Sequence, residues 1–228
     1  MHRVLFIGNS HTYLHRMPLI AAGLAGICGF DVQVAQATGE GAGLAWHWEN
    51  RTTRDKLESG GWTHVVLQER SRGPLEDRPS MFRHARLFDR EIRRLDARTV
   101  FYMTWAAREK PEDQSIIAEA YETIALECRA CLAPVGRAWE IVKGMHPGME
   151  LHHRDGRHAG KAGAYLAACV FCGILSGGVP RQTLSGRLSS GGRTLVNLSE
   201  DTAGVLQRAA IDALRNAGES HEGRRHGS

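Results

Sequence analysis

Residues 4–12 read VLFIGNSHT, an apolar run that leads directly into Gly-Asn-Ser. A short apolar run of this kind is typical of a buried β-strand, and the small residues after it predict a tight turn at the edge of a sheet. A serine held on such a turn can expose its hydroxyl and act as a nucleophile. Serine is also a common cap of the helix that follows a turn. Ser10 is therefore a candidate nucleophile, and helix capping is its alternative role.

The rest of the sequence alternates short apolar runs with longer helical segments. We expect strands at residues 3–7, 30–37, 63–68 and 99–105, and a short fifth strand at residues 134–135. Helices are expected at residues 17–28, 80–95, 111–132, 139–143, 160–175 and 200–217. This alternation predicts an α/β fold, a three-layer α/β/α sandwich with a mostly parallel five-stranded sheet of the flavodoxin-like type.

The length and composition indicate one domain with a full-sized core. The chain has 228 residues, of which 42% are hydrophobic. We expect this domain to span residues 1–218 and residues 219–228 to form a disordered tail. Residues Gly177 to Gly192 are rich in Gly, Ser and Arg, and they predict an excursion on the surface.

The charge pattern argues against a nucleic-acid partner. The formal net charge is +4, and arginines are interspersed with acids instead of forming a basic stripe with aromatic residues. No apolar run approaches the roughly 18 residues of a membrane span, so no membrane partner is expected. The four-residue apolar run at the N-terminus is too short for a signal peptide, which predicts a cytoplasmic protein.

The five cysteines include two C-x-x-C pairs, a spacing that zinc sites use. The pairs are Cys128 with Cys131 and Cys169 with Cys172. Both fall in segments that we expect to be helical, and cysteine is a frequent small residue of protein cores. We therefore predict that they pack in the core, and we expect neither a metal nor another cofactor.

A second polar motif, HHRDGRHA at residues 152–159, precedes an expected helix. An aspartate three residues before a histidine can place its carboxylate on the imidazole from within the same turn. That contact would fix the tautomer of His158 and stabilise its protonated form. Alternatively, Asp155 caps the helix that begins near Gly160.

The candidate residues all lie near the ends of expected strands. In parallel sheets, ligands bind beyond the carboxyl ends of the strands. We therefore expect Ser10, the glycine-rich loop at residues 38–43, Gln68 and Trp105 to meet in one crevice.

Together these motifs resemble the SGNH (GDSL-like) hydrolase superfamily, and most closely a branch with Gly-Asn-Ser-His-Thr and Leu-Gln-Glu-Arg-Ser motifs. The resemblance covers about residues 3–175 and implies that Ser10 is the nucleophile, His158 the general base and Asp155 its orienting carboxylate. It also implies an oxyanion hole that includes the N–H groups of Ser10 and Gly41, with Gly39 and Gly43 as alternatives to Gly41. Gln68 stands where the family has an asparagine, so its amide would be the third donor or would instead satisfy backbone groups at the end of the strand.

The resemblance implies an esterase that acts on a small carboxylic ester, including an acetyl group on a carbohydrate. Four residues are candidates for the wall of the substrate pocket: Trp46, His47, Arg70 and Trp105.

Two alternative functions stay open. A binding module that has lost hydrolysis is favoured by the departure at Gln68. A metal-dependent hydrolase is suggested by a ligand-rich cluster of His146, His152, His153, Asp155 and His158.

Overall fold

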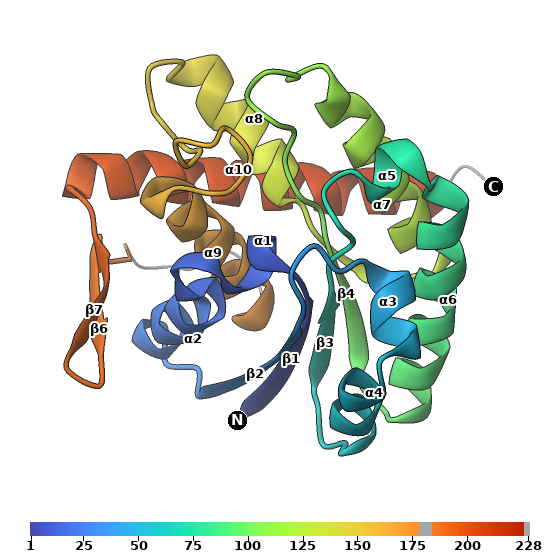
Figure 1. The fold of residues 1–228 in the computed structure, drawn as a ribbon. Helices are drawn as coiled ribbons and strands as arrows, with labels where there is room; N and C mark the ends of the chain where they lie inside the picture. The colour runs from blue at the N-terminus through green and yellow to red at the C-terminus, as the bar shows by residue number, and fades with distance from the viewer. Residues whose placement is uncertain (178–183, 226–228) are drawn as a thin grey trace.

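A parallel sheet of five strands forms the middle layer of the fold (Figure 1). The computed structural model describes residues 1–177 and 184–225. The strands are arranged in the order β2-β1-β3-β4-β5, and all neighbours are parallel. Their bounds are β1 His2–Gly8, β2 Val32–Thr38, β3 His64–Leu67, β4 Arg98–Tyr102 and β5 Cys131–Ala133. The predicted α/β class with a five-stranded sheet is confirmed.

The central strand shows why a parallel sheet needs apolar residues on both faces. Val4 and Phe6 pack into the core on one side of the sheet, and Leu5 and Ile7 pack into the core on the other. All four side chains are fully buried. Burial on both faces makes such a strand an unbroken apolar run, which is the pattern that the sequence shows at residues 4–7.

Helices cover the two faces as separate layers (Figure 1). One layer contains α2 Met17–Ile27, α8 Val135–Met145, α9 Lys161–Leu175 and α10 Glu200–Arg225. The other contains α3 Leu44–Glu49, α4 Arg51–Glu58, α6 Arg78–Arg94 and α7 Asp113–Glu127. Short helices α1 Ser10–Tyr13, η1 Leu14–Arg16 and α5 Gly73–Glu76 follow the ends of β1 and β3.

The strand order places a crevice between the ends of β1 and β3. From β1 the chain runs outward to β2 and then returns to form β3 on the other side of β1. At such a switch point the two connections leave the sheet in opposite directions, and ligands bind in the gap. The turn after β1 and the turn after β3 therefore lie beside each other at the carboxyl edge.

The fifth strand differs from the sequence prediction. The expected helix at residues 111–132 ends at Glu127, and Arg129 adopts a left-handed φ of 48°. The strand is Cys131–Ala133, while Pro134 caps α8 and Val135 begins it. Proline has no N–H to give to a strand ladder but suits a helix start. Cys131 therefore lies in a strand and not in a helix.

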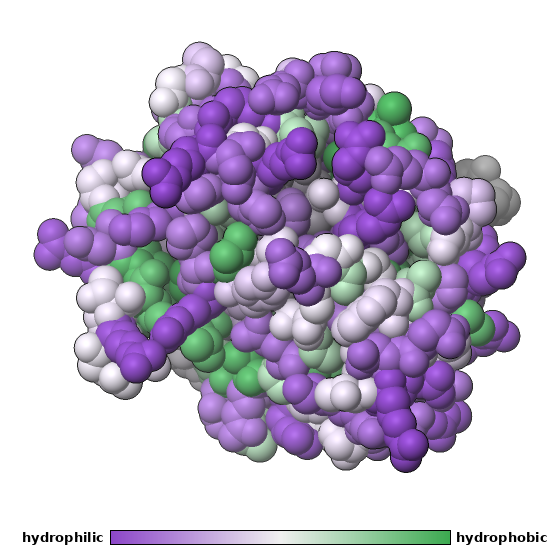
Figure 2. Space-filling model, in the orientation of Figure 1, coloured by the Kyte–Doolittle hydropathy of each residue, from purple (hydrophilic) through white to green (hydrophobic). Residues whose placement is uncertain are grey.

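A hairpin begins in the segment predicted as a surface excursion, residues 177–192, and continues beyond it to Asn197. Strands β6 Arg187–Ser190 and β7 Arg193–Asn197 are antiparallel. Gly191 and Gly192 join them with φ values of 57° and 73°, a conformation that glycine adopts without strain. On the face drawn in Figure 2, hydrophobic residues gather around this hairpin and α2, where a groove is lined by Leu19, Ile27, Leu188 and Leu195.

The predicted domain boundary at residue 218 falls inside α10, which continues to Arg225. Residues 226–228 of the expected tail and residues 178–183 of the expected excursion lie outside the described residues. Within residues 1–177 and 184–225, no helix has both the length and the apolar character that crossing a membrane requires.

Candidate active site

Ser10, His158 and Asp155 form a continuous chain of hydrogen bonds, although Ser10 and His158 are 148 residues apart. The Ser10 Oγ lies 2.9 Å from His158 Nε2. The opposite ring nitrogen, Nδ1, lies 2.8 Å from Asp155 Oδ2. These contacts have the order and distances of a serine hydrolase triad, in which a carboxylate orients a histidine that faces the serine.

The turn after β1 places Ser10 at the start of a helix but does not make it the cap. Asn9 is the N-cap of α1, and its Oδ1 accepts the His11 N–H at 3.0 Å. The helix-capping interpretation of Ser10 is therefore wrong. Gly8 is required by close approach, because a Cβ at this position would overlap Gln68 Oε1. The Ser10 hydroxyl is left free to face His158.

Asp155 organises the turn that carries His158. Its Oδ1 accepts the N–H groups of Arg157 at 2.8 Å and His158 at 3.0 Å. Gly156, between them, has a left-handed φ of 71°. The alternative role of Asp155 as a cap of α9 is wrong, because Gly160 is the N-cap and has no side-chain cap.

The surroundings of Asp155 favour its ionised form. Burial alone would raise the pKa of this carboxyl, but the hydrogen bonds from Arg157, His158 and His153 outweigh burial and hold the pKa well below its usual range. His153 Nδ1 also lies 3.1 Å from Oδ2. An ionised Asp155 accepts a hydrogen bond from the Nδ1–H of His158, which leaves Nε2 as the acceptor that faces Ser10.

Trp105 contacts the turn that carries His158 from the core side and does not line the cleft. Its Nε1 donates to the Arg157 carbonyl at 2.9 Å, and its ring is 1% exposed. The ring stacks on Trp139 with centroids 4.2 Å apart and planes 7° from parallel. The prediction that Trp105 forms part of the substrate wall is wrong, because the side chain is buried and does not line the cleft.

His11 is a neighbour of the site that the sequence analysis missed. Its ring centroid lies 5.3 Å from that of His158 and 4.9 Å from that of Trp105. Burial, reinforced by the charge of His158, lowers the pKa of His11 to about 3, so this ring is neutral at pH 7. Its position directly after Ser10 in the first motif was the available signal.

Two N–H groups are placed to serve as oxyanion donors. Ser10 and Gly41 both line a cleft of about 480 Å³ that also contains His158. Neither N–H donates a hydrogen bond among the described residues. Gly41 has a φ of 62°, a conformation that a residue with a Cβ rarely adopts. By contrast, the Gly39 N–H already donates to the Gly8 carbonyl, and Gly43 does not line the cleft.

Gln68 is not placed to be the third donor. Its side chain is fully buried and does not line the cleft. Its Oε1 accepts the Asn9 N–H at 2.8 Å and the Thr12 hydroxyl at 2.9 Å, and its Nε2 donates to the Glu69 carbonyl at 2.5 Å. The prediction that Gln68 donates to an oxyanion is wrong. Its contacts match the alternative prediction, in which Gln68 satisfies backbone groups at the end of the strand.

The other proposed pocket residues divide between core and surface. His47 is fully buried between the Gly8 carbonyl and the Thr53 hydroxyl, so its predicted contact with substrate is wrong. Arg70 lines the cleft. Trp46 is 48% exposed and lines a neighbouring cavity that shares Gly41 and Arg70 with the cleft. Several other residues that line the cleft were not among the candidates predicted from the sequence: Tyr13, Glu40, Ser71, Arg72 and Arg157.

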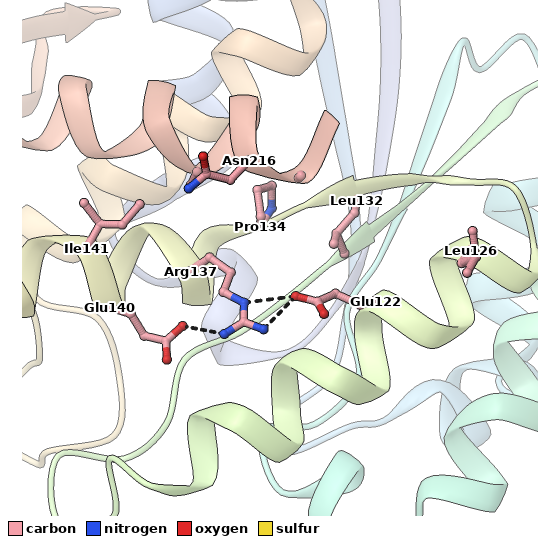
Figure 3. Close-up of a pocket in the computed structure, with 10 residues that line it drawn as sticks. Glu122, Leu126, Leu132, Pro134, Arg137, Glu140, Ile141 and Asn216 are labelled. Atoms are coloured by element: carbon pink, nitrogen blue, oxygen red, sulfur yellow. Dashed lines mark hydrogen bonds and ion pairs between the residues drawn. The ribbon is translucent and has the colours of Figure 1, made fainter. Parts of the chain in front are cut away.

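A cavity of about 340 Å³ elsewhere in the molecule contains none of the predicted site residues. It lies between α7, α8 and α10 (Figure 3). Its central side chain, Arg137, is paired with Glu122 at 2.9 Å and with Glu140 at 3.0 Å. Ser10 and His158, the candidate nucleophile and base, therefore meet at the β1–β3 crevice and not in this cavity.

The suggested ligand cluster is not arranged as a metal site among the described residues, although three of its members are in contact. His152 Nε2 lies 3.0 Å from the Ala106 carbonyl, whereas His153 and His158 both contact Asp155. In the part of the chain that the structure describes, no group of three or more His, Cys, Asp or Glu residues is arranged to hold a metal ion. All five cysteines are free thiols, and the Sγ atoms of Cys28 and Cys172 lie 3.9 Å apart.

Comparison with known proteins finds similarity among solved structures. No family model matches the sequence, and no curated protein matches it. A protein from Slackia heliotrinireducens that is assigned to the SGNH hydrolases is 29% identical, with a TM-score of 0.62, over 75% of this chain and 97% of that one. A DUF4886 family protein from Bacteroides uniformis is 18% identical, with a TM-score of 0.77, over 94% and 95% of the two chains.

A lipase/acylhydrolase from Enterococcus faecalis shares the fold as well, at 17% identity and a TM-score of 0.60, over 80% of this chain and all of that one. The sheet order, the position of Ser10 after β1 and the structural matches agree with one another. The chain belongs to the SGNH hydrolase superfamily.

Proposed function

We propose that the protein is a serine esterase that hydrolyses a small carboxylic ester through an acyl-enzyme. The observation that carries this proposal is the unbroken chain from Ser10 Oγ to His158 Nε2 and from His158 Nδ1 to Asp155, at 2.9 Å and 2.8 Å. Two of the solved neighbours are described as an SGNH hydrolase and a lipase/acylhydrolase, which supports the same reaction class. The reaction needs no cofactor, because serine, imidazole and carboxylate supply the nucleophile and the proton transfers.

In the first half of the proposed reaction, Ser10 Oγ attacks the ester carbonyl carbon while His158 Nε2 takes the hydroxyl proton. The carbonyl oxygen becomes an oxyanion that the N–H groups of Ser10 and Gly41 stabilise. The carbon–oxygen bond to the alcohol then breaks, and His158 returns the proton to the leaving alkoxide. In the second half, water attacks the acyl-enzyme with His158 as base, which releases the acid and restores Ser10.

The cleft suits a short acyl group, and the alcohol portion of the ester extends toward the neighbouring cavity. Its volume is about 480 Å³. Trp46 and Arg70 remain the candidate substrate residues, and an acetyl group on a carbohydrate is one of the small esters that the family resemblance implies.

The test compares wild type with Ser10→Ala on a panel of 4-nitrophenyl esters of increasing acyl length. Wild type should hydrolyse the short esters with a kcat about 1,000-fold or more above that of Ser10→Ala. A fluorophosphonate adduct that maps to Ser10 would be independent support.

Equal rates in the two proteins would overturn the proposal and leave the binding-module alternative. Repeating the assay with a chelator distinguishes a serine esterase from a metal-dependent hydrolase. A serine esterase keeps its rate when chelator is added, whereas a metal-dependent hydrolase loses it.

A further inference from the structure

Glu69 is a buried carboxylate that the proposed reaction does not use. It lies directly beyond β3 and is only 5% exposed. Its Oε2 accepts the Leu44 N–H at 2.9 Å, and its Oε1 accepts the Arg70 N–H at 2.9 Å. Burial raises the pKa of Glu69, whereas these two donors and the Arg70 charge act against that rise. Burial of a carboxylate is unfavourable unless hydrogen bonds stabilise it, so a buried acid that takes no part in the reaction points to a structural role.

The surrounding backbone is shaped to admit this side chain. A Cβ at Gly43 would overlap Glu69 Oε1, and a Cβ at Gly73 would overlap Glu69 Cγ. Neither glycine has a positive φ. Their lack of a side chain, and not their backbone freedom, is therefore what makes room for the carboxylate.

The main chain of Glu69 is anchored as firmly as its side chain. Its N–H donates to the Tyr121 hydroxyl at 3.1 Å, and its carbonyl accepts the Gln68 Nε2. Tyr121 belongs to α7 and is 1% exposed, so the carboxylate is fixed relative to the core of the domain.

The two N–H groups that Glu69 holds belong to the two loops on either side of the crevice. Leu44 is the first residue of α3 and closes the glycine-rich loop that contains Gly41. Arg70 begins the turn after β3, and Arg70 and Ser71 line the cleft together with Ser10 and Gly41. One carboxylate therefore connects both loops.

We propose that Glu69 is a positioning residue that holds the glycine-rich loop against the turn after β3 and so fixes the Gly41 N–H beside Ser10. This inference rests on the proposed esterase function for its effect on rate. Loss of the carboxylate would move an oxyanion donor without removing a substrate contact. The consequence is a lower kcat with a nearly unchanged KM.

The first test measures both kinetic constants with 4-nitrophenyl acetate for Glu69→Gln, which keeps the shape of the side chain. We expect kcat to fall about 30-fold to 100-fold and KM to change less than about threefold. Asp89→Asn is a matched control, since Asp89 is a second buried carboxylate that accepts from Thr99 and Arg93 far from the cleft. A loss of kcat in Asp89→Asn as large as in Glu69→Gln would overturn the proposal.

A double-mutant cycle tests the contact itself. Gly43→Ala should lower kcat in wild type, because the new methyl group displaces the carboxylate, but should have little further effect in Glu69→Ala. Additive losses would contradict the proposed connection.

Hydrogen–deuterium exchange of residues 39–47 provides a readout that does not depend on activity. Exchange in this segment should become about tenfold faster in Glu69→Gln and not in Asp89→Asn. Unchanged exchange in Glu69→Gln would overturn the proposal. If wild type hydrolyses no ester faster than Ser10→Ala, the proposed function fails, while the exchange result still decides whether Glu69 holds the loop.

Discussion

Asp155 holds His158 through both of its carboxylate oxygens. Asp155 Oδ2 contacts His158 Nδ1 at 2.8 Å, while Oδ1 holds the His158 main-chain N–H. The same carboxyl group therefore sets the tautomer of the ring and the shape of the turn that carries it. At the scale of single residues, Asp155 is the group whose replacement should separate chemistry from folding.

Asp155→Asn should lower kcat by about 1,000-fold to 10,000-fold, because an amide N–H facing Nδ1 favours the wrong tautomer of His158. Steady-state kinetics on a 4-nitrophenyl ester measure this loss. Asp96→Asn, on the exposed turn after α6, serves as the control and should retain the wild-type rate. An Asp155→Asn protein that keeps more than about a tenth of the wild-type kcat would show that the carboxylate does not orient the base.

At the scale of elements, the β1–α1 turn is held on β3 by one amide. Gln68 follows β3, and its Oε1 accepts from Asn9 and Thr12, which lie on either side of Ser10. Without that oxygen, two buried donors would have no partner. The contribution of Gln68 to the site is therefore the placement of the nucleophile turn.

Gln68→Ala should lower the free energy of unfolding by about 2–4 kcal/mol, since it leaves the Asn9 N–H and the Thr12 hydroxyl unpaired. Urea denaturation measures this change, with Gln33→Ala on the exposed side of β2 as the control. The folded variant should lose less than about tenfold in kcat, whereas a true oxyanion donor would cost roughly 100-fold or more. A larger loss of kcat with unchanged stability would restore Gln68 as a donor.

Sequence patterns predicted the elements better than they predicted the side of each element that a residue faces. Residues 4–7 are apolar without interruption, so the central strand and its turn were evident. Gln68 and Trp105 were placed in the cleft because they lie near strand ends, and His47 as a candidate for the pocket wall, but all three are buried in the core. Position along a strand fixes the edge of the sheet that a residue approaches, whereas its orientation depends on contacts with distant segments.

Two local signals were available and were not used. The Gly191-Gly192 pair between short polar strands is typical of a two-residue hairpin, and it predicts β6 and β7. Proline is unfavourable in a strand and favourable at a helix start. Pro134 therefore indicates that the fifth strand ends before it, as β5 Cys131–Ala133 does. Glu69 carried no such signal, because its role arises from Gly43 and Gly73 in separate loops.

At the scale of the whole molecule, the fold encloses histidines that stay neutral. Burial lowers the pKa of His47 to about 4 and that of His64 to about 4, although His47 also receives the opposing effect of the Gly8 carbonyl. In the unfolded chain these rings titrate near 6.5, so the unfolded state binds more protons between pH 6.5 and about 4. Stability is therefore full above that window and falls as the pH decreases through it.

Between pH 7.5 and pH 5.5 the free energy of unfolding should decrease by about 1 kcal/mol for each such histidine. Urea midpoints at the two pH values measure the change. His47→Gln should reduce the pH dependence, whereas His146→Gln, on the exposed end of α8, should leave it as in wild type. A stability that is constant across this range would contradict the neutral state of the buried rings.

The stacked pair of Trp105 and Trp139 gives this domain an optical reporter of its own catalytic turn. Trp105 Nε1 is bonded to the Arg157 carbonyl, one residue before His158, and its ring is shielded from solvent. If the turn separates from the indole, that N–H loses its acceptor and the polarity around the ring changes. Among the five tryptophans, the contribution of Trp105 to emission and near-ultraviolet dichroism would therefore change when the turn that carries His158 moves, without a label.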